Sequence, residues 1–150
     1  MPQPMDIVIR PVRKEDLPLL VEIDEVSTGE NRERYLERKL EEALDKKWRL
    51  VASNVIEIEG KVVGFLMAEV ITGEFGLPEN VARIDTIGLL PEYRGKALAT
   101  DLFKHTINQL KKLGVNNVRT LVDWHDQDLI KFFASKGFVP GNMLSLEVKI

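Results

Sequence analysis

Residues 89–103, LLPEYRGKALATDLF, decide how the rest of this sequence is interpreted. The apolar run ends at Pro91, and beyond Gly95 the apolar residues return at the spacing of one helix face. This pattern predicts a strand that turns into a helix. A helix start offers unpaired backbone N–H groups and the positive end of the helix dipole, and Arg94 and Lys96 add charge. The joint is a candidate anion site, although a plain turn with solvated basic residues would produce the same pattern.

The sequence before Pro91 predicts strands and two amphipathic helices. Alternation that ends at a proline favours a first strand, and apolar spacings of three and four favour the helices. Two β-rich runs follow, and the Glu59-Gly60 pair between them is typical of a hairpin turn. In chain order we expect a strand over 6–12, a helix over 14–26, a helix over 32–47, paired strands within 48–73 and a strand over 81–90.

The sequence after Gly95 predicts two more helices and two more strands. We expect a helix to Gly114, a short strand over 116–124, a helix opened by Asp126 or Asp128 and closed at Gly137, and a strand over 142–150. The resulting order is β-α-α-β-β-β-α-β-α-β. Because no repeat or linker interrupts it, we expect one mixed α/β domain over residues 1–150.

Composition excludes several classes of function. A chain of 150 residues with 44% hydrophobic content can bury one core. The 21 Lys+Arg and 24 Asp+Glu leave a net charge of -3, so nucleic acid is not an expected partner. Without cysteine there is no disulfide or thiolate metal site, and two histidines do not suggest a metal cluster. No apolar run reaches the ~18 residues of a membrane span. We therefore expect a cytoplasmic protein without a metal and without a membrane partner.

The string GLLPEYRGKALAT, residues 88–100, resembles the acyl-CoA-binding segment of the GNAT superfamily of N-acetyltransferases. In that family a strand ends near a proline and leads into Arg/Gln-x-x-Gly-x-Gly/Ala at a helix start. Here the pattern falls on Arg94, Ala97 and Ala99. Residues 128–140, DLIKFFASKGFVP, resemble the family's later helix and the Gly-Phe that follows it, and the order of elements is the same. The resemblance implies the GNAT α/β fold and acetyl-CoA as co-substrate.

The resemblance also implies a set of contacts with acetyl-CoA. Backbone amides of the turn would hold the diphosphate, and the diverging fourth and fifth strands would pass the pantetheine arm between them. The phosphate contacts fall on Arg94, Gly95, Lys96, Ala97, Leu98 and Ala99, the pantetheine and thioester contacts on Ile87, Gly88 and Leu89, and further candidate cofactor contacts on Asp126 and Phe133. For Gly88, an accommodation of tight packing is an equal alternative.

The chain departs from the family pattern at two positions. Ala97 replaces the first glycine of Gly-x-Gly/Ala, and its methyl group fits if that residue has a negative φ. Phe133 stands where many members carry a tyrosine that protonates the departing CoA thiolate. Phenylalanine has no proton to give, and a core aromatic is the alternative interpretation of this position.

Two residues are candidates for proton transfer. Asp85, in mid-strand, stands where several family members place the base that takes a proton from the acceptor amine; a salt bridge with an arginine of a neighbouring strand is the alternative. His125 titrates near neutral pH and could serve as a second acid or base, or lie in a solvated loop. Trp124 is a candidate wall of the acceptor pocket, with a cover over the sheet edge as the alternative.

The resemblance implies an acceptor site near the first two helices and the loop before the fourth strand. Acidic residues there would suit a cationic amine, either a small molecule or a peptide, or would form solvated faces: Glu22, Asp24, Glu25, Glu30, Glu74 and Glu79. Because the chain lacks cysteine, direct attack within a ternary complex is favoured over a covalent acyl-enzyme. The alternatives are a non-catalytic acyl-CoA-binding or sensing module and a chain that binds no nucleotide. A homodimer would suit such a family, although no pattern specifies an interface.

Overall fold

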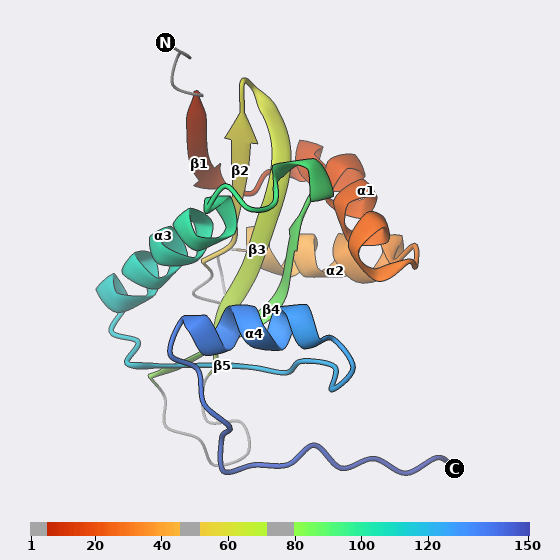
Figure 1. The fold of residues 1–150 in the computed structure, drawn as a ribbon, viewed down its shortest axis with the longest axis vertical. Coiled ribbons are helices and arrows are strands. Elements are labelled where there is room, and N and C mark those ends of the chain that lie inside the picture. Colours follow the sequence, from red (N-terminus) through yellow and green to blue (C-terminus); the bar gives the residue numbers. More distant parts are fainter. Residues whose placement is uncertain (1–5, 46–51, 72–79) are drawn as a thin grey trace.

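A computed structural model describes residues 6–45, 52–71 and 80–150 of the chain. One sheet of five strands has the order β1-β2-β3-β4-β5 (Figure 1). The first three pairs of neighbours are antiparallel, and β4 and β5 run parallel. The strands are β1 (Ile7–Pro11), β2 (Asn54–Ile58), β3 (Lys61–Ile71), β4 (Val81–Leu89) and β5 (Asn117–Thr120).

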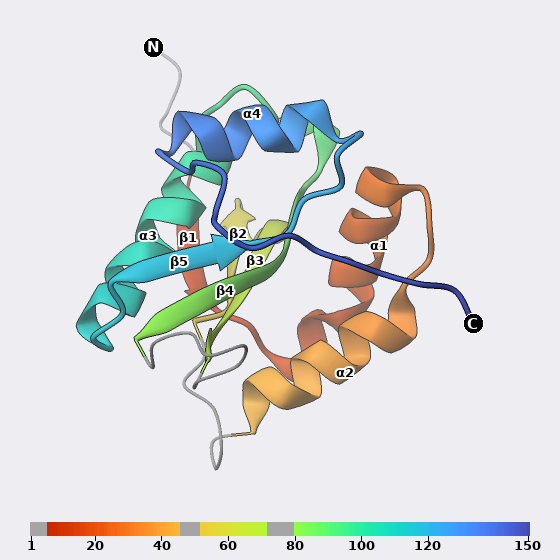
Figure 2. The same ribbon diagram turned by 90° about the horizontal axis from the view of Figure 1, so that it is seen from below.

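In the described part of the chain, four α-helices cover the two faces of this sheet. Figure 2 shows α1 and α2 together on one side of the sheet and α3 with α4 on the other. Short 3-10 turns over Lys14–Asp16 and Pro91–Tyr93 precede α1 and α3. The helices are α1 (Leu17–Thr28), α2 (Glu33–Leu44), α3 (Leu98–Lys112) and α4 (Gln127–Ser135).

Both faces of the central strands are buried. The residues of β3 from Val62 to Glu69 are all buried, as expected for a strand covered by helices on both sides. On one face lie Leu20 and Ile23 of α1 with Leu36 and Leu40 of α2, and on the other lie Leu98, Leu102 and Leu110 of α3. The helical stripes predicted from apolar spacing therefore form the core.

The hairpin predicted at Glu59-Gly60 is confirmed. These two residues join β2 to β3 and have φ values of 50° and 80°. A two-residue loop with positive φ at both positions matches the right-handed twist of the paired strands. Glycine adopts this conformation without strain, whereas Glu59 does not. The remaining parts of the predicted run, 48–51 and 72–73, lie outside the described residues.

The strand predicted over 142–150 is wrong for this structure. The sheet ends at β5, and residues 142–150 run as an extended chain along the lower margin of Figure 1. Leu144 and Leu146 are 87% and 88% exposed. The alternation of apolar and polar residues correctly marks a segment that suits a sheet, but strand pairing also needs an edge, and no edge meets this segment within the described chain.

Candidate functional site

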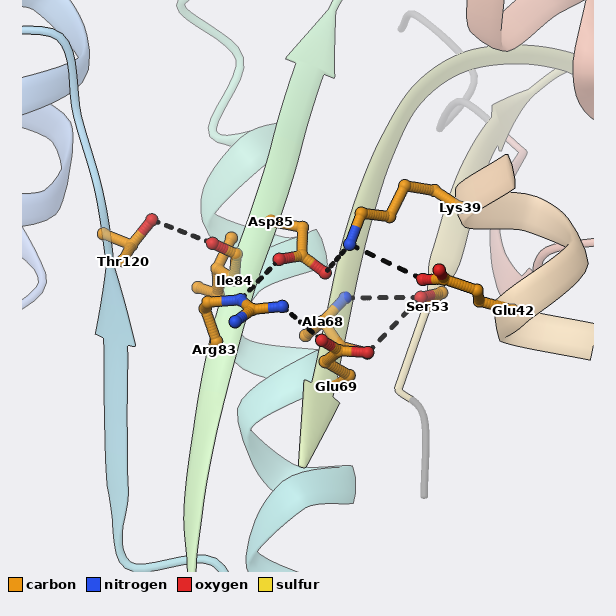
Figure 3. Close-up of polar contacts among 9 residues, drawn as sticks. All are labelled: Lys39, Glu42, Ser53, Ala68, Glu69, Arg83, Ile84, Asp85 and Thr120. Atoms are coloured by element: carbon orange, nitrogen blue, oxygen red, sulfur yellow. Dashed lines mark hydrogen bonds and ion pairs between the residues drawn. The ribbon is translucent and has the colours of Figure 1, made fainter. Parts of the chain in front are cut away.

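The parallel strands β4 and β5 separate halfway along β4. Their pairing ends at Ile84 and Thr120, where the Thr120 hydroxyl donates to the Ile84 carbonyl at 3.0 Å (Figure 3). Beyond this point β4 continues from Asp85 to Leu89 with β3 as its paired neighbour. The edge of β4 that faces away from β3 therefore offers backbone N–H and C=O groups over these residues. The strand predicted over 116–124 is shorter than expected because the chain leaves β4 after Thr120.

The open edge of β4 leads directly into the start of α3. Gly95 and Ala97 have left-handed backbones, with φ of 78° and 60°. Alternation of this kind turns successive N–H groups toward one side and forms a concavity that suits anions. Ala97 caps α3 without a side-chain hydrogen bond, and the first intrahelical bond runs from the Asp101 N–H to the Ala97 carbonyl. The amides of 98–100 are consequently not used by the helix.

The conformation of Ala97 corrects the sequence-based expectation. From the sequence, the methyl group fits this turn if φ is negative; the structure gives φ of 60°, so that condition is not met. Ala97 therefore has the left-handed backbone conformation that favours glycine. A left-handed conformation costs a residue with a Cβ about 1–2 kcal/mol. The flanking side chains of Arg94 and Lys96 are exposed, in the place where they would meet an anion.

A bulge on β4 directs Asp85 toward α2. The register with β3 passes from Ala68 opposite Ile84 to Met67 opposite Thr86, which leaves Asp85 as the extra residue. Bulges of this kind reorient a side chain and are frequent beside active sites. The Asp85 side chain is 10% exposed and reaches Lys39 of α2.

Asp85 belongs to a group of charged residues that we call the charged cluster: Lys39, Glu42, Glu69, Arg83 and Asp85 (Figure 3). Lys39 Nζ lies 3.3 Å from Asp85 Oδ2, and Arg83 Nε donates to Asp85 Oδ1 at 2.7 Å. Arg83 also pairs with Glu69, and Lys39 with Glu42 at 3.6 Å. Beside the cluster is a cavity of about 10 Å³, room for about one water molecule.

Asp85 forms salt bridges in this cluster, as the alternative interpretation of the sequence expected, but its arginine partner is not the expected one. The arginine is Arg83 of the same strand rather than of a neighbouring one. Sequence reasoning missed Lys39, Glu42 and Glu69 as site residues. Glu69 carried a signal, because a carboxylate within an otherwise apolar strand needs a buried partner. Nothing in the sequence distinguishes Lys39 and Glu42 from the other charged residues of α2, because charged residues fill the exposed face of that helix.

Tyr35 of α2 lies on the same side of the sheet as the charged cluster. The Arg32 guanidinium carbon is 4.8 Å from the centre of its ring. Burial, and then the negative charge of Asp85, raise the pKa of the Tyr35 phenol above its ordinary value. The Tyr35 hydroxyl therefore keeps its proton throughout the neutral range.

Gly88 is explained by packing. A Cβ at this position would lie 2.9 Å from Phe65 Cε1, which is too close, and 3.1 Å from Ile23 Cγ2, which is tight. This geometry supports the packing alternative that the sequence left open. The neighbouring Ile87 and Leu89 are half-buried against the core. Their contribution to a ligand site would come through the open backbone edge.

The residues proposed around α4 lie in different surroundings. Phe133 is 4% exposed and packs against Phe138, with ring centres 4.9 Å apart, as a core aromatic does. The Asp126 carboxylate accepts a hydrogen bond from the Leu129 N–H and caps α4, which confirms the predicted helix opening. His125 is 92% exposed at its side chain, with Nδ1 3.1 Å from Asp123 Oδ1. The structure does not bring His125 into the charged cluster.

The acidic residues expected to line the acceptor site do not lie together in one environment. Asp24 is buried and forms an ion pair with Arg32 at 2.6 Å, so its charge is already matched. Glu22, Glu25 and Glu30 are exposed, and Glu74 and Glu79 lie outside the described residues. Trp124 is 80% exposed and covers no sheet edge in the described part of the chain. The acidic groups beside β4 are instead those of the charged cluster.

The chain belongs to the GNAT acetyltransferase family, whose model matches residues 17–138. Acetyl-CoA is the co-substrate of this family. A comparison with curated proteins finds no match. The predicted family and fold class are confirmed, apart from the strand over 142–150.

Solved structures share the fold at low sequence identity. The aminoglycoside N-acetyltransferase AAC(6')-Iy in complex with CoA is 18% identical with a TM-score of 0.79, over 99% of this chain and 98% of that chain. The ribosomal-protein-S18-alanine N-acetyltransferase from Escherichia coli is 20% identical with a TM-score of 0.74, over 91% and 80%. PaiA N-acetyltransferase from Thermoplasma acidophilum in complex with coenzyme A is 22% identical with a TM-score of 0.69, over 93% of each chain.

The described residues contain no group of three or more His, Cys, Asp or Glu side chains placed to hold a metal ion. No described helix combines the length and apolar character that crossing a membrane requires.

Proposed function

We propose that this protein transfers an acetyl group from acetyl-CoA to a primary amine by direct attack in a ternary complex. One observation carries the proposal: the open edge of β4 over 85–89 is followed, after the short 3-10 turn over Pro91–Tyr93, by the left-handed turn at the start of α3, where no side chain caps the first amides. The first part offers a row of backbone groups to an extended chain, and the second offers amides and positive charge to a diphosphate. Acetyl-CoA has both parts in that order.

The donor would be held mainly by backbone groups. Amides of residues 95–99 would bind the diphosphate. The Arg94 N–H already donates to the Pro91 carbonyl, so Arg94, like Lys96, would add charge through its side chain. The open backbone of Ile87, Gly88 and Leu89 would pair with the pantetheine arm and polarise the thioester carbonyl, as preorganised N–H donors do. The side chains of Ala97 and Phe133 take no part in these contacts. Binding of the donor therefore needs no side chain that the family pattern has and this chain lacks.

The acceptor would enter at the charged cluster. The ammonium of Lys39 already lies 3.3 Å from Asp85 and 3.6 Å from Glu42, so this position accepts a primary ammonium group. An acceptor amine would take the place of Lys39 beside Asp85. Asp85, directly or through water, would remove the proton that keeps the amine from attacking.

The reaction then needs one further proton. The amine nitrogen forms a bond to the thioester carbon and gives up its second proton to water, the carbon–sulfur bond breaks, and the CoA thiolate leaves and takes up a proton. Phe133 cannot supply that proton. We propose water as the donor, with the Tyr35 hydroxyl, on the same side of the sheet as Asp85, as a second source of the proton. His125, exposed on the α4 side, is the alternative donor.

A thiol-release assay over a panel of amines and peptides tests the proposal. We expect turnover with at least one acceptor and a fall of about 10²–10⁴-fold in kcat for Asp85→Asn, the usual contribution of a general base. Asp101→Asn, on the exposed face of α3, is the matched control and should leave the rate unchanged. Release of CoA no faster than hydrolysis with every acceptor would contradict the proposal.

A non-catalytic acyl-CoA-binding or sensing module is the second candidate. Two observations favour it: Phe133 is a packed core residue without a proton to give, and Asp85 is occupied by two cations. Calorimetry separates the two functions. Binding of acetyl-CoA without turnover for any acceptor would support the module, and turnover that depends on Asp85 would exclude it.

A further inference from the structure

The side chain of Lys39 points from α2 toward β4 rather than into solvent (Figure 3). It is 18% exposed, whereas its neighbours Glu37 and Arg38 are exposed. A lysine that is held in this way loses rotamer freedom and part of its hydration, so the position needs compensating contacts. Lys39 therefore differs from an ordinary surface lysine on an amphipathic helix.

The contacts around the Lys39 ammonium are those that bind a primary amine. Its Nζ lies 3.3 Å from Asp85 Oδ2 and 3.6 Å from Glu42 Oε2. The centre of the Tyr35 ring is 6.0 Å away, at the outer limit of a cation–π contact. Two carboxylates and an aromatic ring thus surround one ammonium group, which three N–H donors fit.

Asp85 brings this ammonium to the proposed donor site. It is the first residue of β4 beyond the pairing with β5, so the open edge over 85–89 begins at the residue that holds Lys39. Lys104 of α3 and Lys131 of α4 are exposed and belong to helices on the other side of the sheet (Figure 2). The place assigned to an acceptor amine therefore already contains an amine of this chain.

We propose that Lys39 is a modification site, which accepts an acetyl group from acetyl-CoA bound to the same chain. The inference rests on the proposed function, since it uses the same donor site and the same base. Asp85 takes one proton from the ammonium, directly or through water. The nitrogen then bonds to the thioester carbon and gives a second proton to water, while the carbon–sulfur bond breaks and the CoA thiolate takes up a proton. The products are acetylated Lys39 and free CoA.

The tether to α2 favours this reaction over transfer to an unbound amine. An amine held in place beside the base does not pay the entropy of being brought there, which gives it a high effective concentration. The product lacks the positive charge of lysine. Acetylation would therefore end the ion pairs of Lys39 with Asp85 and Glu42, and Asp85 would keep its pair with Arg83.

Mass spectrometry of the purified chain, incubated with ¹³C-labelled acetyl-CoA in a buffer without amines, tests the proposal. We expect one labelled acetyl group on Lys39, added at least tenfold faster than on Lys104 or Lys131, whose exposed amines report uncatalysed acetylation. Lys39→Arg should abolish this fast labelling, and Lys104→Arg, the matched control, should retain it. Labelling of Lys39 at the rate of the exposed lysines, or more slowly, would overturn the proposal.

Two further variants test the base and the transfer within one chain. Asp85→Asn, with its fold verified by circular dichroism, should slow the labelling of Lys39 at least tenfold and leave that of Lys104 unchanged. In a mixture of Lys39→Arg with Asp85→Asn, Lys39 of the second variant should stay slow, because the competent chain cannot reach it. Fast labelling of Lys39 in Asp85→Asn, alone or in the mixture, would refute acetylation by the same chain through Asp85.

Thiol release with external amines, measured in parallel, separates this inference from the proposed function. Turnover of an external amine without fast labelling of Lys39 would overturn the inference and leave the proposed function standing. Fast labelling of Lys39 that depends on Asp85, without turnover of any external amine, would support the inference and contradict transfer to an external acceptor.

Discussion

At the scale of single residues, the backbone of Ala97 is the most informative feature of the molecule. The family pattern has glycine at this position, and the structure shows why, since the residue has φ of 60°. Sequence alone could identify the substitution but not its consequence, because φ is set by the turn and not by the alanine. Because the free-energy cost of this conformation arises at Ala97 itself, substitution of that residue should change the stability of the protein.

Ala97→Gly should stabilise the protein. Relief of the left-handed strain contributes about 1–2 kcal/mol, and the greater freedom of glycine in the unfolded chain offsets roughly 0.5–1 kcal/mol. We expect the free energy of unfolding in urea to rise by about 0.5–1 kcal/mol. Ala99→Gly, two residues further on and within α3, is the control and should lower it by about 1 kcal/mol. Destabilisation by both substitutions would show that Ala97 is not strained.

Lys39 is the second residue whose role can be tested alone. If its ammonium holds the place of the acceptor amine beside Asp85, Lys39→Met should remove an internal competitor while keeping the length of the side chain. We expect a severalfold lower KM for a cationic acceptor, measured by thiol release. Lys104→Met, exposed on α3, is the control and should leave KM unchanged. A KM for Lys39→Met that is raised or unchanged would contradict the proposal that Lys39 and the acceptor amine occupy the same position.

At the scale of elements, the junction between β1 and α1 depends on a buried ion pair. Arg10 of β1 donates two hydrogen bonds to Asp16, at 2.9 and 2.8 Å, and a third to Glu57 of β2 at 2.9 Å. Burial alone would raise the pKa of Asp16, but the hydrogen bonds from Arg10 and from the Arg13 N–H hold it below its ordinary value. The pair thus connects the first strand, the second strand and the first helix.

The lowered pKa of Asp16 predicts how stability depends on pH. An aspartate with a lower pKa in the folded state contributes stability above its unfolded pKa, near pH 4, and loses it as the pH falls through the folded value. Asp16→Asn should therefore destabilise the protein at pH 7 by about 3 kcal/mol. The difference from the native chain should shrink below pH 4. Urea unfolding at pH 7 and pH 3 measures it, and a difference that does not change between them would contradict the assignment.

The sequence predicted the helices and strands better than it predicted which of them pair or contact one another. Apolar spacing placed the helices and the core strands correctly, because burial of one face is a local property of the chain. The bulge at Asp85 was not predictable, since it arises from the register between β3 and β4. The same applies to Lys39, whose contact with Asp85 joins residues far apart in the sequence. The failure over 142–150 has this cause as well, because the pattern specifies a face and not the strand that pairs with it.

At the scale of the whole molecule, the two parts of the proposed site lie at different points along β4. The turn into α3 lies at the end of β4, and the charged cluster lies halfway along it, on the side of α2. A donor laid along the open edge of β4 would bring its diphosphate to the turn and its thioester toward Asp85. The account therefore depends on where acetyl-CoA binds.

The most direct test is an NMR titration of the ¹⁵N-labelled chain with acetyl-CoA. We predict that at saturation the largest shifts occur at the amides of 95–100, with a second set along 86–89 and little change in α2 at Glu37 or Arg38, which face solvent. Saturation that leaves the amides of 95–100 unchanged, or shifts confined to another surface, would contradict the proposed donor site.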